Sequence, residues 1–103
     1  MSRSAKVSHT AAMILQTVHN GWNYGFDIMD VTGLPSGTVY PALRRMESEG
    51  WISSEWEPES KSLAAQRPAR KYYRITASGL EVLEASQQRY PLLGKLATGK
   101  TRR

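Results

Sequence analysis

Two adjacent arginines follow a run of hydroxyl side chains in the segment GLPSGTVYPALRRMESEGW, residues 33–51. The guanidinium groups of Arg44 and Arg45 are suited to phosphates and to the edges of guanine bases. Hydroxyl donors that can bind phosphate oxygens precede them at Ser36, Thr38 and Tyr40. These residue types indicate a surface for an anionic partner such as DNA.

The same segment places a glycine and a proline inside a predicted helix. On a helical wheel, the apolar residues Val39, Leu43 and Met46 form one stripe. The opposite side carries Gly37, Pro41, Arg44, Arg45 and Ser48. Gly37 and Pro41 both lower helix stability, but they form a flat surface at the helix N-terminus, where backbone N–H groups favour a phosphate. The alternative is that LPSG is only a tight turn and the arginines form a solvated face.

The flanking elements follow from periodicity and caps. Helices are predicted over 9–19 with Ser8 or Thr10 as N-cap, over 25–31, over 36–49 with Ser36 as N-cap, and from the cap Thr76 to about residue 90. Strands are predicted over 51–59 and 70–76. The fold class is therefore α+β, mainly α: a winged helix-turn-helix of three helices, a two-stranded β-hairpin wing and a C-terminal helix. We expect a lead-in over 1–8, the DNA-binding domain over 9–90 and a short tail over 91–103.

The predicted hairpin concentrates positive charge at its loop and return strand. Five basic residues and no acidic ones lie between residues 61 and 74: Lys61, Arg67, Arg70, Lys71 and Arg74. We expect the wing, residues 59–71, to contact the DNA backbone or minor groove. The alternative is a solvated hairpin whose charge is balanced by Glu55, Glu57 and Glu59.

Composition agrees with a single small domain. The chain has 103 residues, of which 40% are hydrophobic and 22% charged, so global disorder is not expected. A net charge of +5 suits an anionic partner, although charge alone does not define one. With no cysteine and no long apolar run, we expect a cytoplasmic, nucleoid-associated protein without a membrane partner.

Catalytic chemistry is not favoured by the pattern. His9 and His19 have no acidic or thiol partner at ligand spacing, so neither a metal nor another cofactor is expected. No phosphate loop or nucleophile elbow is present, which disfavours an enzyme. Four aromatic residues either pack the domain or line a slot for a small aromatic or hydrophobic effector: Trp22, Trp51, Trp56 and Tyr90.

Three blocks resemble the signature of PadR-type transcriptional regulators: YGFDI, GLPSGTVYPALRRMESEGWISSEWE and RPARKYYRITASGLEVL. The resemblance covers about residues 11–83 and implies a homodimeric repressor that binds a pseudo-palindromic double-stranded operator. It implies that the third helix enters the major groove and that Arg70 and Lys71 lie on a wing touching backbone or minor groove. The alternative function is a protein–protein interaction module built on a winged helix.

The resemblance also implies dimerisation through the helix after the wing. The expected dimer residues are Ile14, Leu80, Leu83, Gln87, Tyr90 and Leu93. The chain departs from the family in two places. Pro91 ends this helix early, so we expect the dimer contact to be small or to use helix 9–19 and the YPLLGKL segment as well. Gln66 stands where a glycine usually precedes Arg-Pro, so we expect the turn of the wing to differ.

Overall fold

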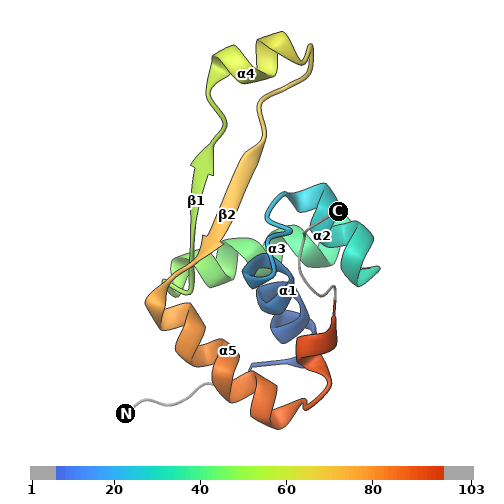
Figure 1. Ribbon diagram of the computed structural model, residues 1–103, viewed down its shortest axis with the longest axis vertical. Helices are drawn as coiled ribbons and strands as arrows, with labels where there is room; N and C mark the ends of the chain where they lie inside the picture. Colours follow the sequence, from blue (N-terminus) through green and yellow to red (C-terminus); the bar gives the residue numbers. More distant parts are fainter. Residues whose placement is uncertain (1–6, 97–103) are drawn as a thin grey trace.

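The computed structural model describes residues 7–96. Its elements in chain order are α1 (His9–His19), α2 (Gly25–Thr32), α3 (Ser36–Ser48), β1 (Ile52–Trp56), α4 (Glu59–Ala64), β2 (Lys71–Ile75), α5 (Ala77–Arg89) and a 3-10 turn, η1 (Leu93–Lys95). The helices α1, α2, α3 and α5 form the body, and the β1–β2 hairpin projects from it with α4 at the far end (Figure 1). The predicted winged helix-turn-helix is confirmed.

Two local expectations are corrected. The segment between the two predicted strands, residues 60–69, was expected to form a loop, but Glu59–Ala64 form α4, which is too short for an apolar period to be recognised in sequence. Its first turn carries Glu59, whose charge suits a helix N-terminus. Ser36 is the first helical residue of α3 and does not cap it, because Pro35 occupies the N-cap position.

The other helix ends follow local chemistry. The Ser8 side chain caps α1 by accepting a hydrogen bond from the Ala11 N–H at 3.1 Å. Thr76 caps α5 in the same way, accepting from the Gly79 N–H at 3.0 Å. Gly33 ends α2 with a φ of 76°, a left-handed conformation that glycine adopts without strain. None of the helices between residues 7 and 96 is long and apolar enough to cross a bilayer.

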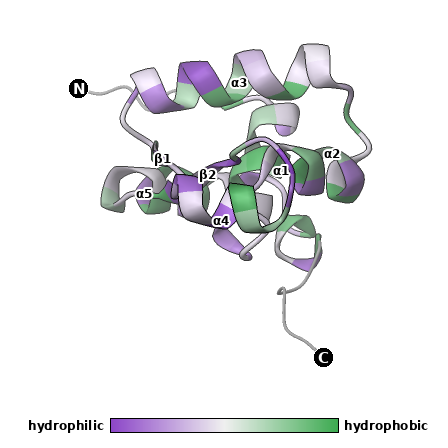
Figure 2. Ribbon diagram, turned by 90° about the horizontal axis from the view of Figure 1, so that it is seen from above, coloured by the Kyte–Doolittle hydropathy of each residue, from purple (hydrophilic) through white to green (hydrophobic). Residues whose placement is uncertain are grey.

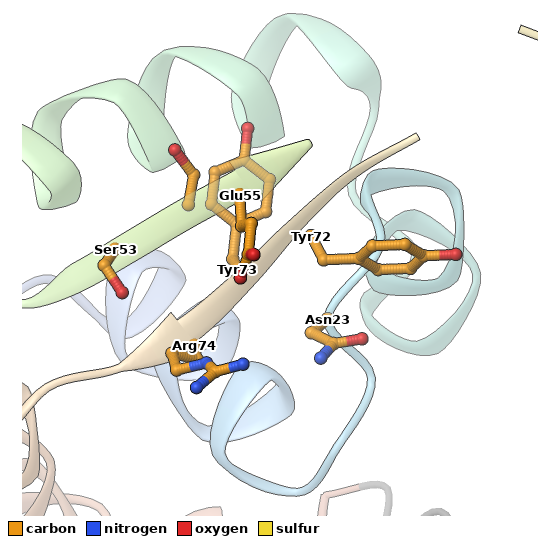
Figure 3. Close-up of a pocket in the computed structure, with 7 residues that line it drawn as sticks. Asn23, Ser53, Glu55, Tyr72, Tyr73 and Arg74 are labelled. Carbon is orange, nitrogen blue, oxygen red and sulfur yellow. The ribbon is translucent and has the colours of Figure 1, made fainter. Parts of the chain in front are cut away.

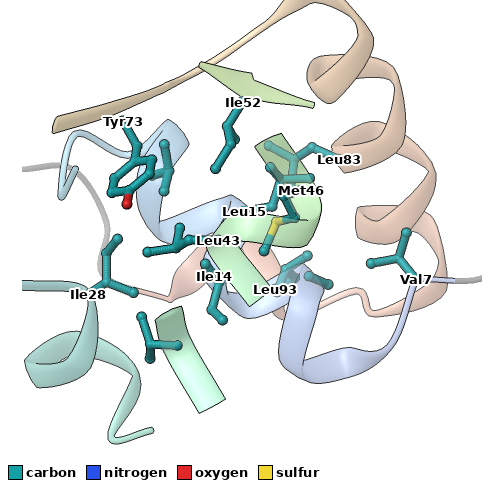
Figure 4. Close-up of a cluster of buried hydrophobic side chains, with 13 residues drawn as sticks. Val7, Ile14, Leu15, Ile28, Leu43, Met46, Ile52, Tyr73, Leu83 and Leu93 are labelled. Carbon is teal, nitrogen blue, oxygen red and sulfur yellow. The ribbon is translucent and has the colours of Figure 1, made fainter. Parts of the chain in front are cut away.

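The hydrophobic core lies where α1 packs against α2, α3, β2 and α5 (Figure 4). Fully buried side chains come from most of these elements: Ile14, Leu15, Ile28, Val39, Leu43, Met46, Ile52 and Leu83. Three expected dimer residues are part of this core, since Ile14, Leu83 and Leu93 are only 0%, 2% and 4% exposed. These three side chains pack inside their own domain, so any contribution to a dimer would come through the elements that carry them.

The hairpin has one face turned toward α3. Its strands are antiparallel, with Ser54 opposite Tyr73 and Trp56 opposite Lys71. The Ser54 hydroxyl donates to the Glu47 carboxylate of α3 at 2.6 Å. Alternate residues of a strand share a face, so Trp56 and Lys71 lie on this same side of the wing.

Gly79 sets how closely α5 approaches the start of the hairpin. A Cβ at this position would meet the backbone carbonyl of Trp51 and would lie 2.7 Å from Cγ1 of Ile75. The Trp51 carbonyl is itself fixed, because it accepts a hydrogen bond from the Thr76 N–H at 3.0 Å. Only a residue without a side chain fits here.

We therefore expect Gly79→Ala to lower the free energy of unfolding by about 1–3 kcal/mol, because α5 must shift away from the hairpin. Helix propensity alone predicts the opposite, a gain of about 0.5–1 kcal/mol. Urea denaturation followed by circular dichroism measures the difference. Ser78→Ala, at the exposed neighbouring position, is the control and should change little. A Gly79→Ala protein more stable than wild type would contradict this packing.

Candidate nucleic-acid interface

The outward face of α3 is flat at its start and basic further along. Figure 2 shows α3 as an outer layer of the molecule. The predicted division holds: Val39, Leu43 and Met46 are buried, while the opposite side is exposed at Gly37, Pro41, Arg44, Arg45 and Ser48. A Cβ added to Gly37 would meet nothing within 4 Å. Neither Gly37 nor Pro41 therefore serves internal packing.

The three predicted hydroxyl donors have different environments. Ser36 is exposed and Thr38 is half-buried at the start of the helix. Tyr40 is half-buried because its ring packs on Gly25 at the start of α2, where a Cβ would lie 2.8 Å from two of its ring carbons. Tyr40 therefore joins the two helices of the helix-turn-helix.

The Glu57 carboxylate holds the wing closed. From the sequence, this glutamate was considered only as a balance for the positive charge of the hairpin. The Glu57 side chain is 4% exposed and receives two hydrogen bonds from the Arg67 guanidinium, at 2.7 and 2.8 Å. It also accepts from the Arg70 backbone N–H at 3.2 Å. The hydrogen bonds from Arg67 lower the pKa of Glu57 to about 2, even though burial acts to raise it. Arg67 is therefore engaged inside the wing.

Gln66 supplies the turn that leads into this ion pair. Its φ is 58°, in the left-handed region that favours glycine. A glycine would adopt this conformation without strain, so the glutamine here occupies a backbone position suited to the glycine that the resemblance implies.

The Arg70 side chain joins the outer end of the β1–β2 ladder to the body. Its guanidinium lies 4.3 Å from the centre of the Tyr24 ring. Tyr24 also forms an isolated bridge with Tyr72, and the Tyr73 N–H donates to the Asn23 carbonyl at 2.9 Å. Tyr24 begins the YGFDI block, but no role was predicted for it, because a residue between two helices carries no periodic signal.

The remaining basic residues of the wing differ in their solvent exposure. Lys61 on α4 and Arg74 on β2 are exposed. Lys71 is half-buried, with its ammonium 5.6 Å from the Trp56 ring centre. The five basic residues thus divide into cations available to a partner and arginines used inside the chain.

The described residues contain a small pocket beside the hairpin, about 120 Å³ in volume (Figure 3). It is lined by Asn23, Ser53, Ser54, Glu55, Tyr72, Tyr73 and Arg74. Its polar lining and small size do not match an apolar slot for an aromatic effector. None of the four aromatic residues suggested for such a slot lines it.

The remaining expected dimer residues lie along α5 and its C-terminal end. Leu80 is 39% exposed, and Leu92, which lies in the YPLLGKL segment, is 72% exposed. Gln87 donates to the Gln16 side chain at 2.8 Å, and the Tyr90 ring packs edge-on against His9. Gln87 and Tyr90 thus already join α5 to α1 within one chain.

Three packed helices followed by a two-stranded wing define a winged helix-turn-helix protein. The chain belongs to the transcriptional regulator PadR-like family, whose model matches residues 14–85. Members of this family are transcription regulators and not enzymes. No curated protein matches the chain in sequence.

Solved structures agree with this family. A PadR family transcription regulator from hypervirulent Clostridium difficile R20291 is 30% identical over 85% of this chain and 93% of its own, with a TM-score of 0.70. A PadR-like transcriptional regulator from Bacillus cereus strain ATCC 14579 is also 30% identical, over 82% and 84% of the two chains, with a TM-score of 0.63. A Streptococcus mutans UA159 protein shares the fold at 24% identity and a TM-score of 0.69, over 98% of this chain and 99% of its own.

The Glu57–Arg67 pair makes the wing sensitive to acid. Because the folded-state pKa of Glu57 is lowered to about 2, its contribution to stability is present above the ordinary carboxyl pKa and is lost as pH falls through about 2. We expect Arg67→Ala to raise this pKa, since burial then acts without a cationic partner. Carboxyl-carbon NMR titration measures it. The control Arg74→Ala should leave the pKa low, and an unchanged pKa in Arg67→Ala would contradict the assignment.

Proposed function

We propose that the chain is a homodimeric, sequence-specific DNA-binding repressor that places α3 in the major groove and its wing on the backbone or minor groove. The exposed face of α3 carries this proposal. It combines Gly37 and Pro41, which present no donors and let a phosphate approach the backbone, with two exposed arginines one turn further on. A face required only for solubility would favour residues of higher helix propensity.

Each part of this face has a role suited to its chemistry. Ser36 and Thr38 at the helix start are assigned to phosphates, and Tyr40 contributes mainly by holding α3 against α2. Arg44 and Arg45 are assigned to base edges or phosphates. With so few side chains able to read bases, sequence-dependent DNA shape supplies part of the specificity.

On the wing, Lys61 and Lys71 are assigned to DNA. Lys61 is exposed on α4, and Lys71 lies on the side of the hairpin that faces α3. Arg67 supports this surface by pairing with Glu57, and Arg70 supports it by stacking on Tyr24. Both arginines therefore act on DNA chiefly by holding the wing in place.

Two copies are assigned to one operator. The exposed leucines Leu80 and Leu92, on α5 and beyond it, are the surface proposed for the homodimer. Two α3 helices in successive major grooves would lie about 34 Å apart, which requires a pseudo-palindromic site. Selection of bound sequences from random duplex DNA tests this directly, since a two-fold symmetric motif is expected.

The competing function is a protein–protein interaction module built on the same winged helix. The basic surface described above favours DNA, because phosphate contacts release counterions and make binding depend steeply on salt. Binding to random duplex at low salt that is no tighter than millimolar would favour the protein module.

Lys61→Ala tests the wing. We expect weaker binding to selected and random duplexes alike, with the slope of log affinity against log salt reduced by about 1 because one phosphate contact is lost. Fluorescence anisotropy at a series of salt concentrations measures both. Lys95→Ala, an exposed lysine in η1, is the matched control and should leave the slope unchanged. An equal slope for Lys61→Ala and wild type would remove α4 from the proposed contact.

The variant Gly37→Ala should have opposite effects on folding stability and on DNA binding. In the open space around Gly37 an alanine should raise the free energy of unfolding by about 0.5–1 kcal/mol, yet its methyl group would hold DNA away from the helix start. We expect a higher melting temperature together with at least about tenfold weaker operator binding, or about 1.4 kcal/mol. Gly94→Ala, which also meets nothing within 4 Å, is the control. Unchanged affinity for Gly37→Ala would contradict the flat-surface argument.

A further inference from the structure

The wing carries an exposed tryptophan on the side that faces the recognition helix. Trp56 ends β1 and is 63% exposed, although an indole in water is unfavourable. From the sequence, Trp56 was expected to pack in the domain or to line a slot. We propose that Trp56 is a DNA contact, its indole packing against sugar and base edges of the minor groove next to α3. The proposal rests on the DNA-binding function above and adds a residue to it.

Strand register determines which way Trp56 faces. Ser54, two residues earlier on β1, donates to Glu47 of α3, so its side of the hairpin is the α3 side. Its partner Tyr73 points toward α3 in Figure 3. Trp56 and its partner Lys71 continue this face one step further from the body. An object lying along the outer face of α3 would therefore meet them.

The Lys71 side chain next to Trp56 indicates what kind of partner would bind at this surface. The Lys71 ammonium lies 5.6 Å from the Trp56 ring centre and 5.9 Å from that of Tyr73. A cation beside an exposed apolar ring matches the minor groove, where phosphates attract the charge and the sugar walls are apolar. A purely apolar protein partner would leave this ammonium buried without a counter-charge, which is costly.

Phe26 provides a matched control on the other side of the hairpin. It is 59% exposed, and its ring packs edge-on against Tyr24 at 5.5 Å. Tyr24 in turn contacts Tyr72, which lies on the hairpin face opposite Ser54 and Tyr73. Phe26, on α2, thus has an exposure similar to that of Trp56 but does not lie on the hairpin face that carries Trp56 and Lys71.

The first test compares Trp56→Ala and Phe26→Ala by anisotropy with a labelled duplex recovered by selection, after thermal melting has shown both variants folded. We expect Trp56→Ala to bind about tenfold more weakly and Phe26→Ala to bind like wild type. Equal affinity for Trp56→Ala and wild type would overturn the inference, as would equal losses in the two variants. Wild-type protein that leaves both selected and random duplexes free at low salt would overturn the proposed function together with it.

Fluorescence gives a readout that does not depend on the alanine variant. The signal of Trp56 is obtained as the difference between wild type and Trp56→Phe, and acrylamide quenching is measured with and without unlabelled duplex. We expect the duplex to protect this difference signal from the quencher. Bound protein in which Trp56 stays as quenchable as in the free chain would reject the contact while leaving DNA binding by α3 intact.

Discussion

The burial of one stripe of α3 is the constraint on which the rest of the structure depends. Val39, Leu43 and Met46 are 0–2% exposed, so the helix cannot rotate without exposing them. A helix with one buried face has its opposite face fixed outward. Gly37, Pro41 and the two arginines therefore form a surface as a consequence of the core, and their side chains contribute little to holding the helix in place.

The wing depends on polar interactions in the same way that α3 depends on apolar ones. A two-stranded hairpin is marginal by itself, so its position needs support from outside the ladder. Within the ladder Ser54 binds Glu47 of α3, and at the outer end of the ladder the Arg70 side chain packs on Tyr24. Beyond it, Arg67 closes the α4 turn onto Glu57. These contacts join the wing to α3 and to the α1–α2 connection. The two surfaces proposed to contact DNA, on α3 and on the wing, are therefore held in place relative to each other.

The sequence predicted the elements that carry strong local signals. The apolar period of α3 and the cap Thr76 led to the right helices and to the winged helix-turn-helix. It could not predict α4, whose six residues contain too few apolar positions. Nor could it divide one apolar stripe between core and surface: Leu83 is buried and Leu80 is exposed, which depends on how α5 lies against α1.

For the candidate site too, the number of charged residues in the sequence does not show which of them are available to a partner. Four basic residues of the wing, Lys61, Arg67, Arg70 and Lys71, were expected to contact DNA, but a count of charges cannot show that Arg67 is paired with a carboxylate ten residues away. An arginine that closes a turn and a lysine that projects from it are equivalent in composition and differ in function. What distinguishes them is whether a counter-charge lies within the chain, and this is decided by strand register. Four of the five basic residues, Lys61, Arg70, Lys71 and Arg74, have no carboxylate partner among the described ion pairs. Of these, Arg70 packs on Tyr24, while Lys61 is exposed on α4 and Lys71 lies on the α3 side of the hairpin. The local excess charge that can attract a phosphate backbone therefore lies at the wing tip and beside Trp56, on the side of the hairpin that α3 shares.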